Sequence, residues 1–332
     1  MTIKSIYIPN WVTFSNAQLA SMAGVDRLLW AFSGWASDGS LAYSDVSTIA
    51  AFVAQAKSVL PTVKVLVSFG GYDANMAGLV NMPTAAAGSA AWLVRETGAD
   101  GIDLDWEYPG QSTTNTTVLA QFASTFRMDA PAGALLTAAV SVDPTNFAPP
   151  SSDAGTGKWD ELHIMTYDWA GSWVSTFQHN TSLVLAKKAV QAWIDAGYHP
   201  AELSIGVPFY GKSVQVTAAG TNAGLNQPTS NASWWQTLTY DQIAALDRTQ
   251  YTQQWDALGC APWLWNPNTL TAVTYCDKYE IQWFKNYCLC RGLQGVFAWC
   301  EGQDDASYTL TTSLLSTIPT PGLPGSAGAM GS

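Results

Sequence analysis

Basic residues are scarce in this chain. Lys and Arg together number 14 among 332 residues, against 25 Asp and Glu, which gives a formal net charge of −11 at pH 7. Binding to a nucleic-acid backbone depends on a clustered basic surface, and so few cations do not provide one. The charge balance therefore argues against nucleic acid as a partner and favours a neutral or cationic ligand.

Long apolar runs are lacking as well. A helix that crosses a bilayer needs about eighteen or more consecutive apolar residues, and no such run occurs, so we expect no membrane span and no membrane partner. The first strand-like segment, 3–8, follows the initial residues at once, and a secretory leader is therefore not expected in this chain. Asn-X-Ser/Thr sequons at Asn115, Asn180 and Asn231 weakly favour a secreted protein whose leader is missing, and a cytoplasmic protein stays open.

Cysteine does not occur before position 260. None of the later cysteines has the Cys-x-x-Cys spacing of a zinc site, and we expect no metal. One or two disulfides and fully reduced, buried thiols are equally open interpretations. The cysteines are Cys260, Cys276, Cys288, Cys290 and Cys300.

Short β-branched and apolar runs alternate with stretches of helical length along most of the chain. This order is typical of parallel sheets, and eight such runs predict an α/β fold, a closed (β/α)8 TIM barrel. A chain that is 48% hydrophobic and of this length suits one barrel with an insertion better than two full domains. The expected strands are 5–11, 27–35, 63–71, 101–107, 135–142, 161–169, 202–210 and 293–299.

The interval between the last two expected strands is much longer than one helix requires. Polar and aromatic residues fill it, which predicts an insertion at about 213–265 that forms one wall of a substrate groove. We expect the barrel and its insertion to occupy residues 1–318. Residues 319–332 are rich in Pro, Gly and Ser, which predicts a flexible tail or a cloning remnant.

Acidic residues crowd one of the expected strands, with the spacing Asp-x-x-Asp-x-Asp-x-Glu from Asp100 to Glu107. Because side chains alternate between the faces of a strand, Asp103, Asp105 and Glu107 should share one face. Carboxylates about 7 Å apart raise one another's pKa values, which costs stability unless a protonated carboxyl is useful. We infer a proton donor that works at neutral or mildly acidic pH.

Two plainer interpretations of this acidic segment are weaker. Its strict alternation of acidic and apolar residues argues against a loop. Calcium loops use Gly and polar spacers to bend the backbone around the ion, whereas the spacers here are Ile102, Leu104 and Trp106. We therefore expect no metal and no other cofactor.

The run DGIDLDWEYPG, from Asp100 to Gly110, resembles the signature strand of the glycoside hydrolase family 18 chitinases. Ser68–Gly71 is similar to the SxGG strand end of that family, and Met165–Asp168 matches its MTYD strand end. Segments 206–211 and 295–299 continue the match in the order of the family. The long interval before the last strand resembles, in shortened form, the small α+β insertion of many members.

The resemblance implies a role for each central acid. Glu107 would protonate the glycosidic oxygen and later activate water, while Asp105 would orient the 2-acetamido group, whose carbonyl oxygen attacks C1. Asp103 would share a proton with Asp105, although a purely structural role for Asp103 stays open. Tyr167 would hydrogen-bond the acetamido oxygen. Ser68 is expected to bond Asp103 and to pack at the top of the barrel.

Aromatic residues are the second group of candidates. The 16 tryptophans offer flat faces to sugar rings, although many tryptophans only fill cores. The resemblance makes Trp299 the floor beneath the sugar at the cleaved bond. The expected substrate-binding residues are Trp299, Asp168, Met165, Tyr210, Trp106, Tyr7, Trp11 and Phe32. Trp35, Trp169, Trp173 and Trp265 are either further subsites or core residues.

The resemblance implies a monomeric chitinase that hydrolyses β-1,4-N-acetylglucosamine linkages of chitin or chitooligosaccharides by retaining, substrate-assisted catalysis. Two alternatives are a chitin-binding lectin without turnover and an endo-β-N-acetylglucosaminidase that acts on N-glycans. One departure from the family is Lys212, which stands where many relatives have an Arg after the strand-seven motif. Because Lys lacks the bidentate fork of Arg, we expect substrate positioning there to differ.

Overall fold

The predicted barrel is confirmed. The computed structural model describes residues 2–42, 46–110, 112–147, 159–231 and 234–316. Eight parallel strands close in the order β1-β13-β7-β6-β5-β4-β3-β2. These strands are β1 (Ile3–Pro9), β2 (Arg27–Ser33), β3 (Lys64–Gly70), β4 (Gly101–Asp105), β5 (Leu135–Val140), β6 (Glu161–Ile164), β7 (Leu203–Pro208) and β13 (Gly295–Trp299).

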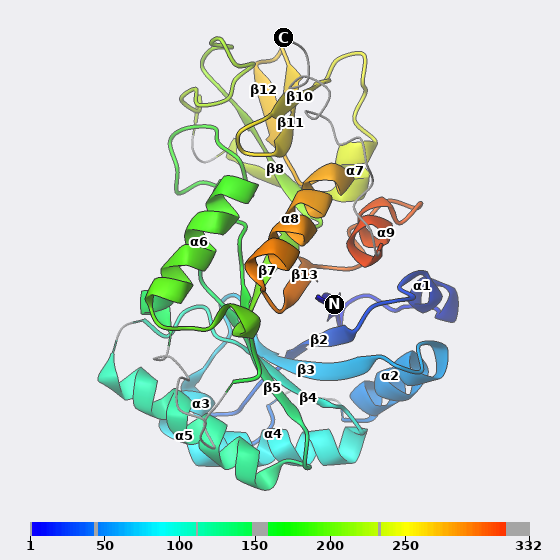
Figure 1. Ribbon diagram of the computed structural model, residues 1–332, viewed down its shortest axis with the longest axis vertical. Helices are drawn as coiled ribbons and strands as arrows, with labels where there is room; N and C mark the ends of the chain where they lie inside the picture. The colour runs from blue at the N-terminus through cyan, green and yellow to red at the C-terminus, as the bar shows by residue number, and fades with distance from the viewer. Residues whose placement is uncertain (1, 43–45, 111, 148–158, 232–233, 317–332) are drawn as a thin grey trace.

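Helices surround the strands (Figure 1), with α4 and α5 along the lower side in that view and α6 and α8 along the upper side. Serine, aspartate and proline begin several of them: Ser182 caps α6, Asp277 caps α8, and Pro83 occupies the first turn of α4. The helices are α1 (Asn16–Ser21), α2 (Val46–Val59), α3 (Ala77–Asn81), α4 (Pro83–Thr97), α5 (Thr113–Asp129), α6 (Leu183–Asp195), α8 (Lys278–Arg291) and α9 (Thr309–Leu315).

Alternation along the strands divides the interior in two. On β4, Ile102 and Leu104 face outward and join the large core between the barrel and its helices. Inward-facing residues such as Tyr7, Leu29 and Phe297 form a separate cluster inside the barrel. The acidic residues of β4 therefore point into the barrel, on the face opposite the apolar spacers.

Seven of the eight barrel strands are shorter than predicted, and two of the differences affect the site. β4 ends at Asp105 and β6 ends at Ile164, so Glu107 and Tyr167 stand in the loops that follow. The prediction that Glu107 shares a strand face with the two aspartates is therefore wrong in detail. The reason is that the hydrogen bonds between neighbouring strands stop at the rim of the barrel, where β4 ends. Beyond that point the alternation of a strand no longer fixes the direction of a side chain.

The predicted insertion is a second sheet with its own core. Five antiparallel strands follow the order β10-β11-β12-β8-β9, and Figure 1 shows them beyond the upper ends of α6 and α8. Phe177, Val214, Trp263 and Trp265 are buried within it. The sheet runs from Tyr210 to Thr274, wider than the expected 213–265. Its elements are β8 (Tyr210–Gln215), β9 (Gln236–Thr239), α7 (Tyr240–Ala244), β10 (Thr252–Asp256), β11 (Ala261–Asn266) and β12 (Thr271–Thr274).

The cysteines are all free thiols, and Cys276, Cys288 and Cys300 are buried. Of the two interpretations left open, reduced thiols are the one that the structure contains. No helix in the described ranges is long and apolar enough to cross a membrane. The expected tail, 319–332, lies outside the described residues.

Stability should depend on the layer between the barrel and α5. Phe126 of this helix is fully buried, whereas Met128, two residues later, is 69% exposed. We expect Phe126→Ala to lower the free energy of unfolding by about 3–5 kcal/mol, because it removes a buried ring and leaves a cavity. Met128→Ala is the matched control and should change it by less than about 0.5 kcal/mol. Urea denaturation measures both, and equal effects would contradict this packing.

Candidate active site

A cavity of about 400 Å³ lies at the carboxyl ends of the barrel strands. Most of the predicted site residues line it, although they come from segments far apart in the sequence. Sequence analysis did not single out Tyr72 as a site residue, although it follows directly on the SxGG-like segment. The lining residues are Trp11, Phe32, Gly70, Gly71, Tyr72, Asp105, Glu107, Met165, Tyr167, Asp168, Tyr210 and Trp299.

Two expected substrate-binding residues do not line this cavity. Trp106 is half-buried and packs against the outer core. Tyr7 lies inside the barrel, 1% exposed, and its hydroxyl donates to Asp103 Oδ2 at 2.9 Å. Trp106 follows the outward side of β4, and Tyr7 stands one layer below the cavity.

The other tryptophans differ among themselves. Trp35 is buried in the outer core, stacked on Phe69 at 4.4 Å between ring centroids, and Trp265 is buried in the core of the insertion. These two are core residues. Trp11 and Trp173 are 64% and 62% exposed, and Trp11 lines the cavity.

Close backbone approach shapes the floor of the cavity where β3 meets β4. Gly70 has φ +122°, and a Cβ there would stand 1.9 Å from the carbonyl oxygen of Asp105. The N–H of Gly71 donates to that same carbonyl oxygen at 2.8 Å. Any side chain at Gly70 would therefore push Asp105 out of place.

Asp103 lies beneath the cavity and is fully buried. Its carboxylate accepts hydrogen bonds from Ser68 Oγ and Thr137 Oγ1, both at 2.7 Å, as well as from Tyr7. The expected bond from Ser68 is thus confirmed. Burial opposes ionisation of Asp103, but the contact with His163 and the bonds from the two hydroxyls outweigh it and hold the pKa below its ordinary value.

Asp105 has the opposite tendency. Burial, together with the negative charges of Glu107 and Asp103, raises its pKa well above the ordinary value. Its Oδ1 atom is buried and has no hydrogen-bond partner among the described residues. The two aspartates on one strand face are therefore shifted in opposite directions: the pKa of Asp103 is lowered and that of Asp105 is raised.

Glu107 is also a proton carrier. Burial raises its pKa most, the neighbouring Tyr108 hydroxyl opposes the rise, and the charges of Asp168 and Asp73 add to it, so that the pKa reaches about 7. A carboxyl with this pKa is largely protonated in mildly acidic solution and can still lose its proton at neutral pH. These are the properties of a general acid that later acts as a base.

Tyr167 and Asp168 form the opposite side of the cavity. Burial and the nearby carboxylates raise the pKa of Tyr167 well above its ordinary value, so its hydroxyl stays a donor. Asp168 has φ 59° and pairs with Lys212, whose Nζ lies 2.7 Å from Asp168 Oδ1. The same Nζ lies 4.6 Å from the ring centroid of Trp173. Lys212 thus makes one ion pair, with Asp168, and lies over the rings of Trp173 and Tyr210, the latter at 5.8 Å.

Trp299 closes the cavity from the end of β13. Its ring stacks on Phe32 at 5.6 Å between centroids and lies 5.3 Å from the ring of Tyr7. Met165 completes this apolar side. The cavity therefore combines flat aromatic surfaces with three carboxyl groups, Asp105, Glu107 and Asp168.

Asp100 is structural. Its Oδ2 accepts from the N–H of Val65 at 2.9 Å and pairs with Lys57 at 2.9 Å, so it fixes the entry of β4 at the opposite end from the cavity. In the described part of the chain, no group of three His, Cys, Asp or Glu side chains is arranged to hold a metal ion.

Comparison with known proteins identifies the family of this arrangement. The sequence model of "Glycosyl hydrolases family 18" matches residues 4–304. The chain belongs to glycosyl hydrolase family 18. The family resemblance of the acidic strand and the strand ends is thereby confirmed over nearly the whole chain.

Individual family 18 relatives are distant in sequence. Chitinase 1 of Aphanocladium album is 28% identical over 374 aligned residues, with 95% of this chain and 84% of that protein covered. Chitinase A1 of Niallia circulans is 27% identical, with 80% of this chain covered, and the alignment covers only 44% of its length. A class V chitinase mutant from Nicotiana tobaccum, solved in complex with NAG4, matches with a TM-score of 0.84 and 25% identity, over 95% of this chain and 98% of that one.

Proposed function

We propose that this protein is a chitinase that hydrolyses β-1,4 bonds between N-acetylglucosamine units of chitin or chitooligosaccharides. The observation that carries the proposal is that two carboxyls with raised pKa values, Asp105 and Glu107, line one cavity walled by aromatic rings. The names of the relatives agree with it, since they are called chitinases. The tobacco protein that shares the fold was solved with NAG4 bound.

The arrangement of acids favours a nucleophile from the substrate. Glycosidases with two protein carboxyls place one on each side of the sugar. Here Asp105 and Glu107 are two residues apart, and Asp168 is engaged by Lys212. Among the described residues that line the cavity, no second carboxylate is thus free to attack C1 from the face opposite Glu107. The 2-acetamido group of the sugar can do so, as in substrate-assisted enzymes of this family.

The reaction then proceeds in two balanced steps. Glu107 gives its proton to the glycosidic oxygen, the C1–O bond breaks, and the acetamido carbonyl oxygen bonds to C1 to form an oxazolinium ion. Asp105 accepts the N–H of the acetamido group and Tyr167 donates to its oxygen. Water next attacks C1, the ionised Glu107 takes the proton from that water, and the acetamido group is released. Two inversions at C1 give overall retention.

A lectin without turnover has no need for these protonated acids. Keeping carboxyl groups buried and neutral costs stability, and a site that only binds a sugar has no use for a proton donor. The endo-β-N-acetylglucosaminidase alternative has no specific observation in its favour. Hydrolysis of a fluorogenic chitobioside separates turnover from binding alone.

Replacing the acid should abolish turnover and spare binding. We expect Glu107→Gln to lower kcat by at least about a hundredfold, because the proton donor is lost while the shape of the side chain is retained. Affinity for a chitooligosaccharide, measured by calorimetry, should stay within a few-fold of the original value. Near-normal turnover in this variant would show that Glu107 is not the acid.

Removal of the acetyl group from the substrate should also stop the reaction. We expect a fully deacetylated chitosan oligomer to resist cleavage, because an amine at C2 has no carbonyl oxygen to attack C1. Chromatography of the products against those of the acetylated oligomer measures this. Efficient release of glucosamine would point to a protein nucleophile.

The pH dependence should be bell-shaped. Activity should fall above about pH 7 as Glu107 loses its proton, and in acid as the Asp103–Asp105 pair takes up a second proton. We expect the maximum in the mildly acidic range, roughly pH 4 to 6. Initial rates across pH 3 to 9 test it, and a rate that keeps rising through pH 8 would contradict the assignment of Glu107 as an acid.

A further inference from the structure

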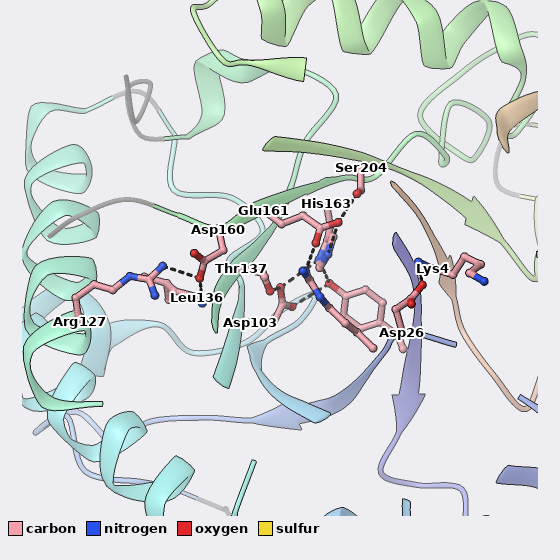
Figure 2. A network of polar contacts seen from close by, with 12 residues as sticks. Lys4, Asp26, Asp103, Arg127, Leu136, Thr137, Asp160, Glu161, His163 and Ser204 are labelled. Carbon is pink, nitrogen blue, oxygen red and sulfur yellow. Dashed lines mark hydrogen bonds and ion pairs between the residues drawn. The ribbon is translucent and has the colours of Figure 1, made fainter. Parts of the chain in front are cut away.

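A column of charged side chains runs through the barrel below the cavity. Arg27 enters from β2, Glu161 and His163 from β6, and Asp103 from β4, and their exposed fractions are 7%, 1%, 0% and 0%. Figure 2 shows Glu161, His163 and Asp103 turned toward one another inside the barrel. None of the steps proposed for the sugar uses Arg27, Glu161 or His163.

The contacts in this column alternate in charge. Arg27 forms an ion pair with Glu161. The two ring nitrogens of His163 lie between two carboxylates, Nε2 at 3.5 Å from Glu161 Oε1 and Nδ1 at 3.3 Å from Asp103 Oδ1. Ser204 donates to Glu161, as Thr137 does to Asp103. Both carboxylates are thus held by hydroxyls and share His163.

The surroundings of His163 favour a second proton on its ring: Nδ1 contacts the Tyr7 oxygen and Asp103, and Nε2, which has no hydrogen-bond partner among the described residues, lies 3.5 Å from Glu161 Oε1. The oxygen of Tyr7 lies 3.4 Å from Nδ1, and because that hydroxyl donates to Asp103 it presents only a lone pair. The ring of Phe297 is a further, apolar neighbour, 5.1 Å between centroids. A neutral imidazole has a single N–H, so only the imidazolium can donate toward both carboxylates.

Charge balance leads to the same state. With a neutral His163, two buried carboxylates would share the single charge of Arg27, and an unpaired charge in a barrel interior is costly. With His163 protonated, the four groups sum to zero. Burial lowers the pKa of His163, but Glu161 and Asp103 more than reverse this effect and raise it to about 9.

We propose that His163 is a positioning residue that keeps Asp103 ionised and thereby places the proton of the Asp103–Asp105 pair on Asp105. Asp103 faces the imidazolium, whereas Asp105 faces only like charges, Asp103 and Glu107. The proton therefore stays on the upper carboxyl, next to the cavity. The inference rests on the proposed function, in which an oxygen of Asp105 accepts the acetamido N–H.

The first test reads proton positions without any turnover. The chain has only three histidines, so single His→Gln variants assign their ring signals in 15N NMR spectra. We expect both nitrogens of His163 to stay protonated through pH 8. In spectra of 13C-labelled aspartate, assigned with Asp103→Asn and Asp105→Asn, Asp105 should be protonated and Asp103 ionised at pH 6. A neutral His163 at pH 7, or an ionised Asp105 at pH 6, would overturn the proposal.

The second test is a shift in the pH profile. In His163→Gln the cation next to Asp103 is gone, so the pKa of the pair rises and the acid limb of kcat should move up by at least about one pH unit. The alkaline limb, set by Glu107, should move less. A residue needed only for packing would lower kcat equally at every pH, and an unmoved acid limb would overturn the proposal.

His179→Gln is the matched control. His179 is also nearly buried and pairs with a carboxylate, Asp256, at 3.1 Å, but it lies at the insertion. The His179→Gln variant should leave the acid limb of the pH profile in place.

If His163→Gln fails to fold, the spectra of the unaltered protein still decide. Absence of chitooligosaccharide hydrolysis by the unaltered protein would remove the proposed function, whereas the protonation states of His163, Asp103 and Asp105 would be read from the spectra independently.

Discussion

The negative charge of Asp103 in the middle of the barrel is the constraint around which the interior is arranged. Hydroxyl groups from three other strands converge on it, Tyr7 from β1, Ser68 from β3 and Thr137 from β5. Small and polar side chains therefore occupy positions that aliphatic residues commonly fill in barrels of this kind. The buried charge of Asp103 also raises the pKa of Asp105 in the layer above, next to the cavity.

Much of the architecture was predictable from local patterns. The eight apolar runs predicted the eight strands, and the acidic run of β4 predicted both the inward face of Asp103 and the position of Asp105. The ends of the strands were less predictable. Hydrophobic runs continue past the last ladder bond, so the sequence does not reveal that Glu107 has left the sheet, or that Trp106 packs outward while Trp299 faces the cavity.

The charged column was missed for a different reason. Glu161 and His163 stand two residues apart in an otherwise apolar strand, which is a visible signal of a shared inward face. Their partner Arg27, however, is more than a hundred residues earlier, at the start of β2, and only barrel closure brings it to Glu161. Contacts of this kind depend on the register of strands, which alternation alone does not determine.

A charged contact links the insertion to the surroundings of Glu107. Lys212 belongs to β8, the first strand of the inserted sheet, and its ammonium group compensates Asp168, one of the charges that raise the pKa of Glu107. An exchange of this sheet between relatives would thus alter the strength of the acid along with the wall of the groove. Grafting a different inserted sheet onto this barrel would therefore also shift the pKa of Glu107.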